Sequence, residues 1–318
     1  MKCLVIAAYM GDLPALMPLW LRSASCNPDI DFLVVSDRSW TAPLPANVRF
    51  KHATLADLAA VWSEAAGFPV ALDSPYKIND FKPLIWMLAD NLEAYDYWGF
   101  CDLDVIFGDL SVLTAGRLGR YDMIASEGHF RLVRNTPDCR DAWREIDYPR
   151  TWQDVLSDPA NFGMDEHHGF NGVFARGTRS WFTDPGRVAD IDPAFRQMRR
   201  MARLPNHECQ AFYWDEGRIY REYWADGRYG RDQYAYIHLQ KRKQPIDPLC
   251  LTAPAINIDP QGIAPRSVGD DQPAALARRN PWHLPTLGEA RIQLREWVRA
   301  RRGIEHVIHP VDRPPAQD

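Results

Sequence analysis

Compact apolar runs alternate with segments of helical spacing along the first part of the chain. The runs at 3–9 (CLVIAAY) and 31–37 (DFLVVSD) are typical of buried strands. Residues 14–26 and 55–66 repeat their apolar positions at helical spacing. Continuously apolar strands separated by helices indicate a mostly parallel sheet flanked by helices, the Rossmann-type α/β class.

The following segments extend this pattern. Residues 83–92 predict a helix that begins at Pro83, because proline is favoured in the first turn. The run YWGFCDLDVIFG (97–108) predicts one strand that is buried on both faces. Further strands are expected at 121–128, 169–176, 218–224 and 234–243, and further helices at 193–203 and 207–214.

The composition changes after Gln244, where prolines recur and interrupt regular structure. We therefore expect a main domain at 1–243 and, at 244–318, a Pro-rich C-terminal extension that wraps around it. Residues 287–302 predict an amphipathic helix, with leucine, tryptophan and valine on one face and arginines beside them.

The bulk composition excludes several classes of protein. The chain has 318 residues, 46% of them hydrophobic, and a net charge of −5, whereas a dedicated nucleic-acid binder is usually basic. Its six cysteines form no C-x-x-C pair, which favours reduced thiols in the cytoplasm. The apolar N-terminal run is too short for a signal peptide, and no segment reaches the ~20 apolar residues that cross a bilayer.

Asp102 and Asp104 interrupt the most strongly apolar run of the chain. On a strand their carboxylates would project from one face, about 6–7 Å apart. Two carboxylates this close repel each other, and a hard divalent cation such as Mg²⁺ or Mn²⁺ relieves the repulsion. The pair therefore predicts a metal–diphosphate site at the carboxyl end of a strand. The alternative is a pair of strand-end carboxylates that bind arginine or cap a turn.

Four stretches resemble the GT-A glycosyltransferases, which use nucleotide-sugar donors. They are YKINDFKP (76–83), WGFCDLDVIFGDL (98–110), GFNGVFAR (169–176) and IHLQKRK (237–243). The chain is similar in particular to a group of small bacterial proteins linked to polysaccharide synthesis. The resemblance implies a GT-A-like catalytic domain at 1–243, Mn²⁺ or Mg²⁺ as the cofactor and a UDP-sugar as the donor.

The resemblance also implies a set of metal ligands. Asp104 would be the principal ligand, and Asp102 would bind the metal, the ribose of the donor or both. IHLQKRK is similar to the late His-then-Lys segment of the retaining galactosyltransferase and glycogenin type, which makes His238 a third ligand and Lys241 a diphosphate contact. The sequence departs from that type because no Gly-x-x-Lys follows. The alternative for His238 is a hydrogen-bonded histidine within a sheet.

Other residues are expected to bind the donor. Lys82 precedes the predicted helix start, where an ammonium group and a helix N-terminus favour an anion. The alternative is a surface lysine, with Asp80 capping the helix. By their position in a GT-A protein, Ala8 and Tyr9 would hold the nucleobase, Tyr9 by stacking, and Asp37 would accept hydrogen bonds from base or ribose.

The acceptor side is expected in DEHHGFNGVFAR, residues 165–176, which resembles the acceptor-side strand of the family. Asn171 would bind sugar hydroxyls, and Gly172 would let a substrate approach the backbone. Asp165 or Glu166 would serve as a base or as a nucleophile-like carboxylate.

The resemblance implies metal-dependent transfer of a sugar from a nucleotide-diphosphate sugar to a glycan or lipid-linked acceptor in cell-surface polysaccharide synthesis, a hexosyltransferase-like reaction. The cation and nearby basic groups would stabilise charge on the leaving phosphate. One alternative is a haloacid-dehalogenase-like phosphatase, because DLDVI nearly fits D-x-D-x-[TV], with Asp102 as nucleophile, Asp104 as general acid and Ile106 in the last position. Another is a non-catalytic sugar-binding protein on the same fold.

The predicted C-terminal helix at 287–302 carries a separate hypothesis. Arginines beside its apolar face would suit an anionic membrane surface, where lipid-linked acceptors reside. We therefore expect a cytoplasmic protein with peripheral contact at the inner membrane face. The alternative is a helix that packs on the catalytic domain.

Overall fold

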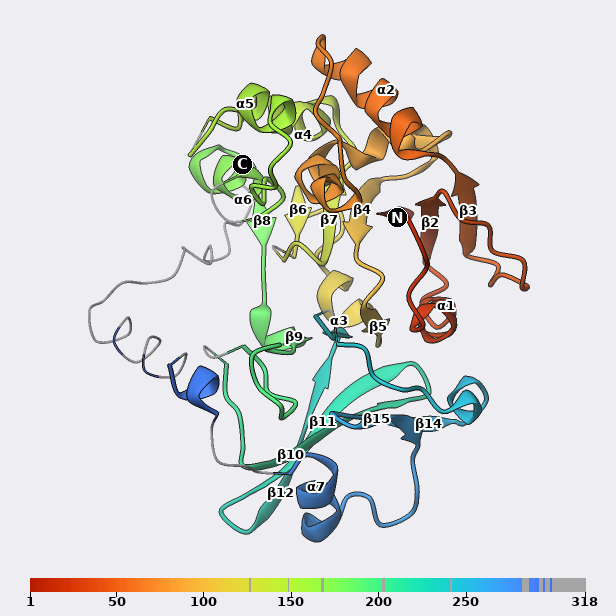
Figure 1. Ribbon diagram of the computed structural model, residues 1–318, viewed down its shortest axis with the longest axis vertical. Helices are drawn as coiled ribbons and strands as arrows, with labels where there is room; N and C mark the ends of the chain where they lie inside the picture. The colour runs from red at the N-terminus through yellow and green to blue at the C-terminus, as the bar shows by residue number, and fades with distance from the viewer. Residues whose placement is uncertain are drawn as a thin grey trace.

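Three β-sheets organise the part of the chain that the computed structural model describes, which is residues 1–125, 127–147, 149–166, 169–201, 204–240, 242–281, 286–291, 294 and 298. Figure 1 shows a seven-stranded sheet with most of the helices in the upper part of the molecule and a five-stranded sheet in the lower part. Strands β5 (Val105–Phe107) and β9 (Val188–Asp190) lie between them and belong to a three-stranded sheet.

The seven-stranded sheet has the order β3-β2-β1-β4-β7-β6-β8. Its strands are β1 (Cys3–Tyr9), β2 (Ile30–Ser36), β3 (Val48–His52), β4 (Tyr97–Cys101), β6 (Met123–Ile124), β7 (Phe130–Arg134) and β8 (Trp181–Phe182). Only β7 runs antiparallel to its neighbours; the other neighbouring strands pair in parallel.

Helices cover both faces of this sheet. Along β1, Leu4 and Ile6 point into a core shared with Trp62, whereas Val5 points into a second core with Trp20. This alternation follows from the two-residue period of a strand. The sheet is therefore buried on both sides, and the predicted α/β class, a mostly parallel sheet flanked by helices, is confirmed.

The helices in the described residues are mostly short. They are α1 (Met17–Ser25), α2 (Leu55–Ala66), α3 (Ser111–Thr114), α4 (Pro137–Asp141), α5 (Trp152–Ser157), α6 (Phe170–Arg176) and α7 (Pro273–Arg279), with 3₁₀ helices η1 (Pro75–Leu88), η2 (Leu92–Ala94), η3 (Ala142–Glu145), η4 (Pro185–Arg187) and η5 (Pro248–Leu251). None of these described helices has the length and apolar character that a bilayer crossing requires.

Local signals set the bounds of α2, which match the prediction. Thr54 and Asp57 form a reciprocal capping box that satisfies main-chain N–H groups at its start. At its end, Gly67 takes a φ of 81°, a left-handed conformation that suits glycine.

The single strand predicted at 97–108 is wrong. The chain leaves the main sheet after Cys101, turns, and enters the three-stranded sheet as β5. The physical reason lies in the two aspartates, because an unpaired carboxylate is costly inside a sheet. In the turn, the side chains of Asp102 and Asp104 are each 30% exposed.

The helix predicted at 83–92 is confirmed only in part. Residues 75–88 form the 3₁₀ helix η1, which begins before Pro83 and ends at Leu88. Proline lacks an N–H donor and disfavours the α conformation of the residue before it. The strand predicted at 234–243 is shorter than expected, because β13 spans Tyr236–His238 and Gln240 has a positive φ of 47°.

Four further predictions fail in whole or in part in the middle of the chain. GFNGVFAR forms helix α6, where Phe170, Val173 and Phe174 recur at helical spacing and enter the core. The helix predicted at 207–214 is strand β10 (Cys209–Asp215), which is rich in aromatic residues. Residues 193–201 contain no helix, and the strand predicted at 121–128 is reduced to β6.

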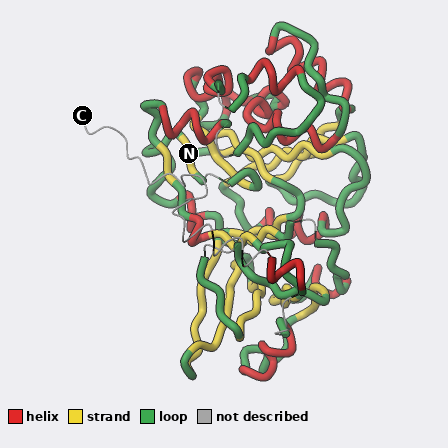
Figure 2. The backbone as a smooth tube through the Cα atoms, turned by 60° about the vertical axis from the view of Figure 1, so that its left-hand side comes forward, coloured by secondary structure: helices red, strands yellow, loops and turns green. Residues whose placement is uncertain are grey.

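The five-stranded sheet is antiparallel and has the order β12-β11-β10-β14-β15. Figure 2 shows strands in yellow side by side in the lower part of the molecule. Its other strands are β11 (Arg218–Ala225), where a strand was predicted, β12 (Arg228–Tyr234), β14 (Ala255–Asp259) and β15 (Gly262–Pro265). Residues beyond Gln244 thus add two strands to a sheet that begins earlier. The domain boundary at 243 stays a prediction, and most of the predicted helix at 287–302 lies outside the described residues.

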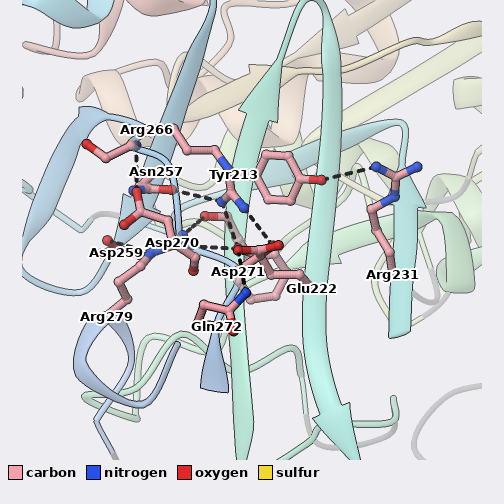
Figure 3. A network of polar contacts seen from close by, with 12 residues as sticks. Tyr213, Glu222, Arg231, Asn257, Asp259, Arg266, Asp270, Asp271, Gln272 and Arg279 are labelled. Carbon is pink, nitrogen blue, oxygen red and sulfur yellow. Dashed lines mark hydrogen bonds and ion pairs between the residues drawn. The ribbon is translucent and has the colours of Figure 1, made fainter. Parts of the chain in front are cut away.

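A buried ionic network joins this sheet to α7 (Figure 3). The carboxylate of Glu222, fully buried on β11, lies 2.7 Å from guanidinium nitrogens of both Arg266 and Arg279. Arg279 also pairs with Asp259 at 3.1 Å. The network therefore fixes α7 and the segment after β15 against the strands.

Strand pairing in the three-stranded sheet brings candidate site residues together. Its central strand β13 pairs in antiparallel fashion with β5 and in parallel with β9. The register places His238 opposite Val105 on one side and opposite Asp190 on the other. Since Asp104 directly precedes Val105, residues distant in sequence meet in one row.

Candidate functional site

The turn between β4 and β5 carries Asp102 and Asp104, and its backbone is held by hydrogen bonds from distant segments. The N–H of Asp102 donates to the carbonyl of His129 at 3.2 Å, and Trp20 Nε1 donates to the carbonyl of Asp102 at 3.1 Å. The N–H of Leu239 donates to the carbonyl of Asp104 at 2.9 Å. The two carboxylates are therefore presented from a fixed main chain.

His238 lies next to these carboxylates. Its Nε2 is 3.3 Å from Oδ1 of Asp104, and one ligand atom from each of Asp102, Asp104 and His238 lies within 4.8 Å of the others. The structure thus brings together the three residues that the sequence singled out as metal ligands, although a turn holds the aspartates instead of the expected strand.

This donor set fits a divalent cation. Two carboxylates supply the hard oxygen ligands that Mg²⁺ and Mn²⁺ prefer, and an imidazole nitrogen extends the range toward first-row transition metals. Three protein ligands on one side leave the remaining positions for water or phosphate oxygens.

The histidines of the site lie close together and have displaced pKa values. Burial lowers the pKa of His238, but hydrogen bonds to Asp104 and Asp190 outweigh it and raise the pKa to about 10. The ring of His129 stacks on that of His238 at a centroid distance of 4.1 Å. Burial and the neighbouring His238 lower the pKa of His129 to about 3.

A cavity of about 980 Å³ borders the turn. Its walls come from the end of β1 and residues 12–16, from η1, from residues 101–104 and from residues 239 and 242–246. Ala8 and Tyr9 both line it, and Tyr9 is 36% exposed. The cavity is therefore lined both by the residues predicted to hold the nucleobase and by Asp102 and Asp104, two of the predicted metal ligands.

Basic side chains border the same cavity. Arg242 and Lys243 line it, as does Lys82. The guanidinium of Arg242 also donates to the carbonyl of Asp192 at 2.9 Å, which fixes its position. Lys241, the expected diphosphate contact, lies outside the described residues.

Lys82 is neither at a helix start nor on the surface, in contrast to both expectations. Its ammonium group contacts Asp102 at 2.8 Å, Asp165 at 3.2 Å and the carbonyl of Gly128 at 2.8 Å. An ammonium group has three donors, so these acceptors satisfy all of them. Burial lowers the pKa of Lys82, but the carboxylates of Asp102 and Asp165 outweigh burial and raise it.

Asp165 and Glu166 lie behind this lysine. Asp165 is 4% exposed, and its burial raises the pKa of the carboxyl group to about 7 against the opposing effect of Lys82. Oε1 of Glu166 accepts a hydrogen bond from the N–H of Gly128 at 3.1 Å. Neither residue lines the cavity, so their expected role at an acceptor has no support from their position.

A second buried ion pair explains the rest of the YKINDFKP stretch. Lys77 and Asp80 are fully buried and lie 2.8 Å apart. Lys77 also donates to the carbonyl of Ala160 at 2.6 Å, and Asp80 accepts from the N–H groups of Phe162 and Met164 at 2.9 and 2.8 Å. This pair fixes the segment that leads to Asp165.

Three other expected site residues, all described, do not line the cavity. Asp37 accepts a hydrogen bond from the N–H of Gly11 at 2.8 Å and so holds the loop after β1. Asn171 and Gly172 lie on α6, where a side chain added at Gly172 would meet Arg176. The helix replaces the acceptor-side strand on which their expected role depended.

Sequence reasoning missed Asp190 and His129. Asp190 ends β9 in the stretch VADID, whose alternation of apolar and acidic residues is a strand signal. His129 directly precedes β7, and nothing in its local sequence indicates that it stacks on His238.

Comparisons with known proteins give one family and a distant structural likeness. The model of a family described as "Family of unknown function (DUF6625)" matches residues 5–267. A crystal structure of apo-form glycosyltransferase GlyE from Streptococcus pneumoniae TIGR4 is similar, with a TM-score of 0.32 and 12% identity. The match covers 58% of this chain and 46% of that chain. Curated proteins include no match to the sequence.

Proposed function

The chain belongs to DUF6625, a family of unknown function, and we propose that it is a metal-dependent glycosyltransferase. It transfers a sugar from a nucleotide-diphosphate sugar, with UDP as the nucleotide, to a hydroxyl of a glycan or lipid-linked acceptor in cell-surface polysaccharide synthesis. The observation that supports the proposal is the convergence of His238 with Asp102 and Asp104, the two carboxylates that line the cavity.

The cavity offers an aromatic contact and positive charge to a ligand with one aromatic end and one anionic end. Tyr9 offers an exposed ring for a nucleobase at the end of β1. Arg242 and Lys243 offer positive charge on the wall formed by residues after β13. The carboxyl ends of strands are where open α/β sheets bind ligands.

The chain's own residues pre-organise the reacting end. Asp102, Asp104 and Nε2 of His238 would hold a divalent cation, which supplies Lewis-acid stabilisation of the leaving diphosphate. The ammonium group of Lys82 compensates the charge of Asp102 and holds Oδ1 of that carboxylate in place. The hydrogen bonds of Trp20 and Leu239 hold the turn, so little reorganisation accompanies the reaction.

Asp165 acts through Lys82 in this proposal and does not contact the acceptor. It is buried and paired with the same ammonium group that holds Asp102. A membrane contact through residues 287–302 and a cytoplasmic location remain part of the proposal.

A thermal-shift screen tests the proposed function. Full-length protein is heated with UDP, GDP, CMP and the corresponding nucleotide sugars, each with and without Mn²⁺. We expect stabilisation by UDP and UDP-sugars that requires Mn²⁺, since a ligand at 100 times its Kd adds about 2.7 kcal/mol. Asp104→Asn should lose the Mn²⁺-dependent part, whereas a substitution of the exposed Asp29 to Asn should retain it.

The same samples separate the alternatives. If none of the nucleotides or nucleotide sugars gives metal-dependent stabilisation, the proposal is contradicted. Phosphate release together with a phospho-aspartate at residue 102 would favour the phosphatase. Unchanged ligand binding in Asp104→Asn would favour a sugar-binding protein without metal chemistry.

A further inference from the structure

Asp190 lies on the far side of His238 from the two aspartates of the turn. The register of the three-stranded sheet places His238 between Val105 on β5 and Asp190 on β9. Nδ1 of His238 is 2.8 Å from Oδ1 of Asp190, and Nε2 is 3.3 Å from Oδ1 of Asp104. The imidazole thus presents one nitrogen to each side.

The bond between His238 and Asp190 has a defined direction. An ionised carboxylate has no hydrogen to donate, so Nδ1 of His238 must donate to Asp190. Nε2 faces Asp104, and a cation bound there would take the place of the Nε2 proton. Asp190 can hold Nδ1 in place because its side chain is largely buried, at 18% exposed, and because the pairing of β9 with β13 fixes its backbone.

A second group fixes the carboxylate of Asp190. Nε2 of Gln240 donates to the same Oδ1 at 2.8 Å. Gln240 has a positive φ of 47°, a conformation that a residue without special constraint rarely adopts. The backbone after β13 therefore takes an uncommon conformation at the residue that anchors Asp190.

His129 does not make this cluster a separate metal centre. One ligand atom from each of His129, Asp190 and His238 lies within 4.8 Å of the others, close enough for the three to share an ion. The two imidazole rings, however, stack with an interplanar angle of 30°. A metal lies in the plane of each imidazole that binds it, and facing rings direct their nitrogens side by side instead of toward one ion. Nδ1 of His129 also contacts the hydroxyl of Tyr236 at 2.9 Å.

We propose that Asp190 is the positioning residue of the metal centre: it holds Nδ1–H of His238 so that Nε2 points at Asp104. The inference rests on the proposed metal-dependent function. Carboxylates that orient a ligating histidine commonly contribute 10- to 100-fold to metal affinity. The ring of His129 stacks on that of His238.

Calorimetric titration with Mn²⁺, alone and with UDP, tests this role without an activity assay. The proteins are the wild type, Asp190→Ala, Asp190→Asn, Asp104→Ala and the control Asp192→Asn. In the wild type the buried carboxylate of Asp192 accepts a hydrogen bond from the N–H of Ala194. We expect Asp190→Ala to weaken Mn²⁺ binding 10- to 100-fold and Asp190→Asn to weaken it less, because an amide oxygen still accepts from Nδ1. Asp192→Asn should bind as the wild type does, and Asp104→Ala should lose binding.

Metal-free crystal structures of the wild type and both Asp190 variants provide a second readout. The His238 ring should keep its orientation in Asp190→Asn and turn in Asp190→Ala. Thermal unfolding of each variant identifies any that fails to fold, and Asp190→Asn then carries the test.

The outcomes separate the inference from the proposed function. If the wild type and Asp190→Ala bind Mn²⁺ equally and the ring does not move, the positioning role is wrong and the metal centre stands. If no protein binds Mn²⁺ even with UDP, the proposed function is wrong, and the ring orientations still decide the role of Asp190. If Asp190→Ala loses binding and Asp104→Ala keeps it, the cation binds on the Asp190 side and the inference is overturned.

Discussion

Buried charged residues in the YKINDFKP stretch hold the segments that carry the site. Lys77 and Asp80 hold the segment that leads to Asp165, and Lys82 joins Asp165 to Asp102. Each is a charged side chain removed from water, and such a group is tolerated only when paired and hydrogen-bonded. The stretch thus supports the turn structurally, and a contact of Lys82 with the diphosphate stays a prediction.

Lys77→Met should destabilise the protein by about 3–5 kcal/mol, because it leaves the carboxylate of Asp80 buried without its counter-charge. Urea denaturation measures the change in the free energy of unfolding. The matched control is Lys51→Met, which removes a lysine paired with Asp90 at the surface and should cost at most about 1 kcal/mol. Equal effects of the two substitutions would show that burial of the Lys77 pair is not important for stability.

At the scale of single residues, the sequence indicates which side chains are candidate metal ligands better than it indicates which residues contact one another. Asp102 and Asp104 could be identified because carboxylates in an apolar run are unusual, and His238 because of the motif around it. The position of Asp190 could not be inferred, since it depends on the register of β9 against β13. The acceptors of Lys82 likewise come from segments far along the chain.

At the scale of elements, local signals are decisive only where tertiary contacts agree with them. The capping box and Gly67 fix both ends of α2, and the apolar run at 3–9 forms β1 as predicted. The run at 97–108 has the composition of a single strand, yet the need to hydrate two carboxylates divides it. The stretch at 169–176 has β-branched and aromatic residues, but its core contacts follow the helical period.

The link between α7 and the five-stranded sheet depends on Glu222 (Figure 3). Glu222→Leu should lower the free energy of unfolding by about 3–5 kcal/mol, since Arg266 and Arg279 lose a fully buried counter-charge. Urea denaturation followed by tryptophan fluorescence provides the measurement. Glu93→Gln, at an exposed position, is the control and should stay within about 0.5 kcal/mol of the wild type. A loss below 1 kcal/mol for Glu222→Leu would contradict the role of the network.

At the scale of the whole molecule, the cavity is assembled from segments that are remote in sequence. Its lining comes from the end of β1, from η1, from the turn at 101–104, from residues 242–246 and from Ile263. The α/β class follows from the apolar pattern of the first part of the chain. The five-stranded sheet could not be foreseen, because three of its strands precede the Pro-rich segment, two lie within it, and they pair through non-local contacts.

The most direct measurement of the central claim is anomalous diffraction at the manganese edge from crystals soaked in Mn²⁺ and UDP. The account predicts one strong peak between the carboxylates of Asp102 and Asp104 and Nε2 of His238, with the diphosphate beside it in the cavity. A peak elsewhere, or none at this position in crystals that contain bound UDP, would contradict it.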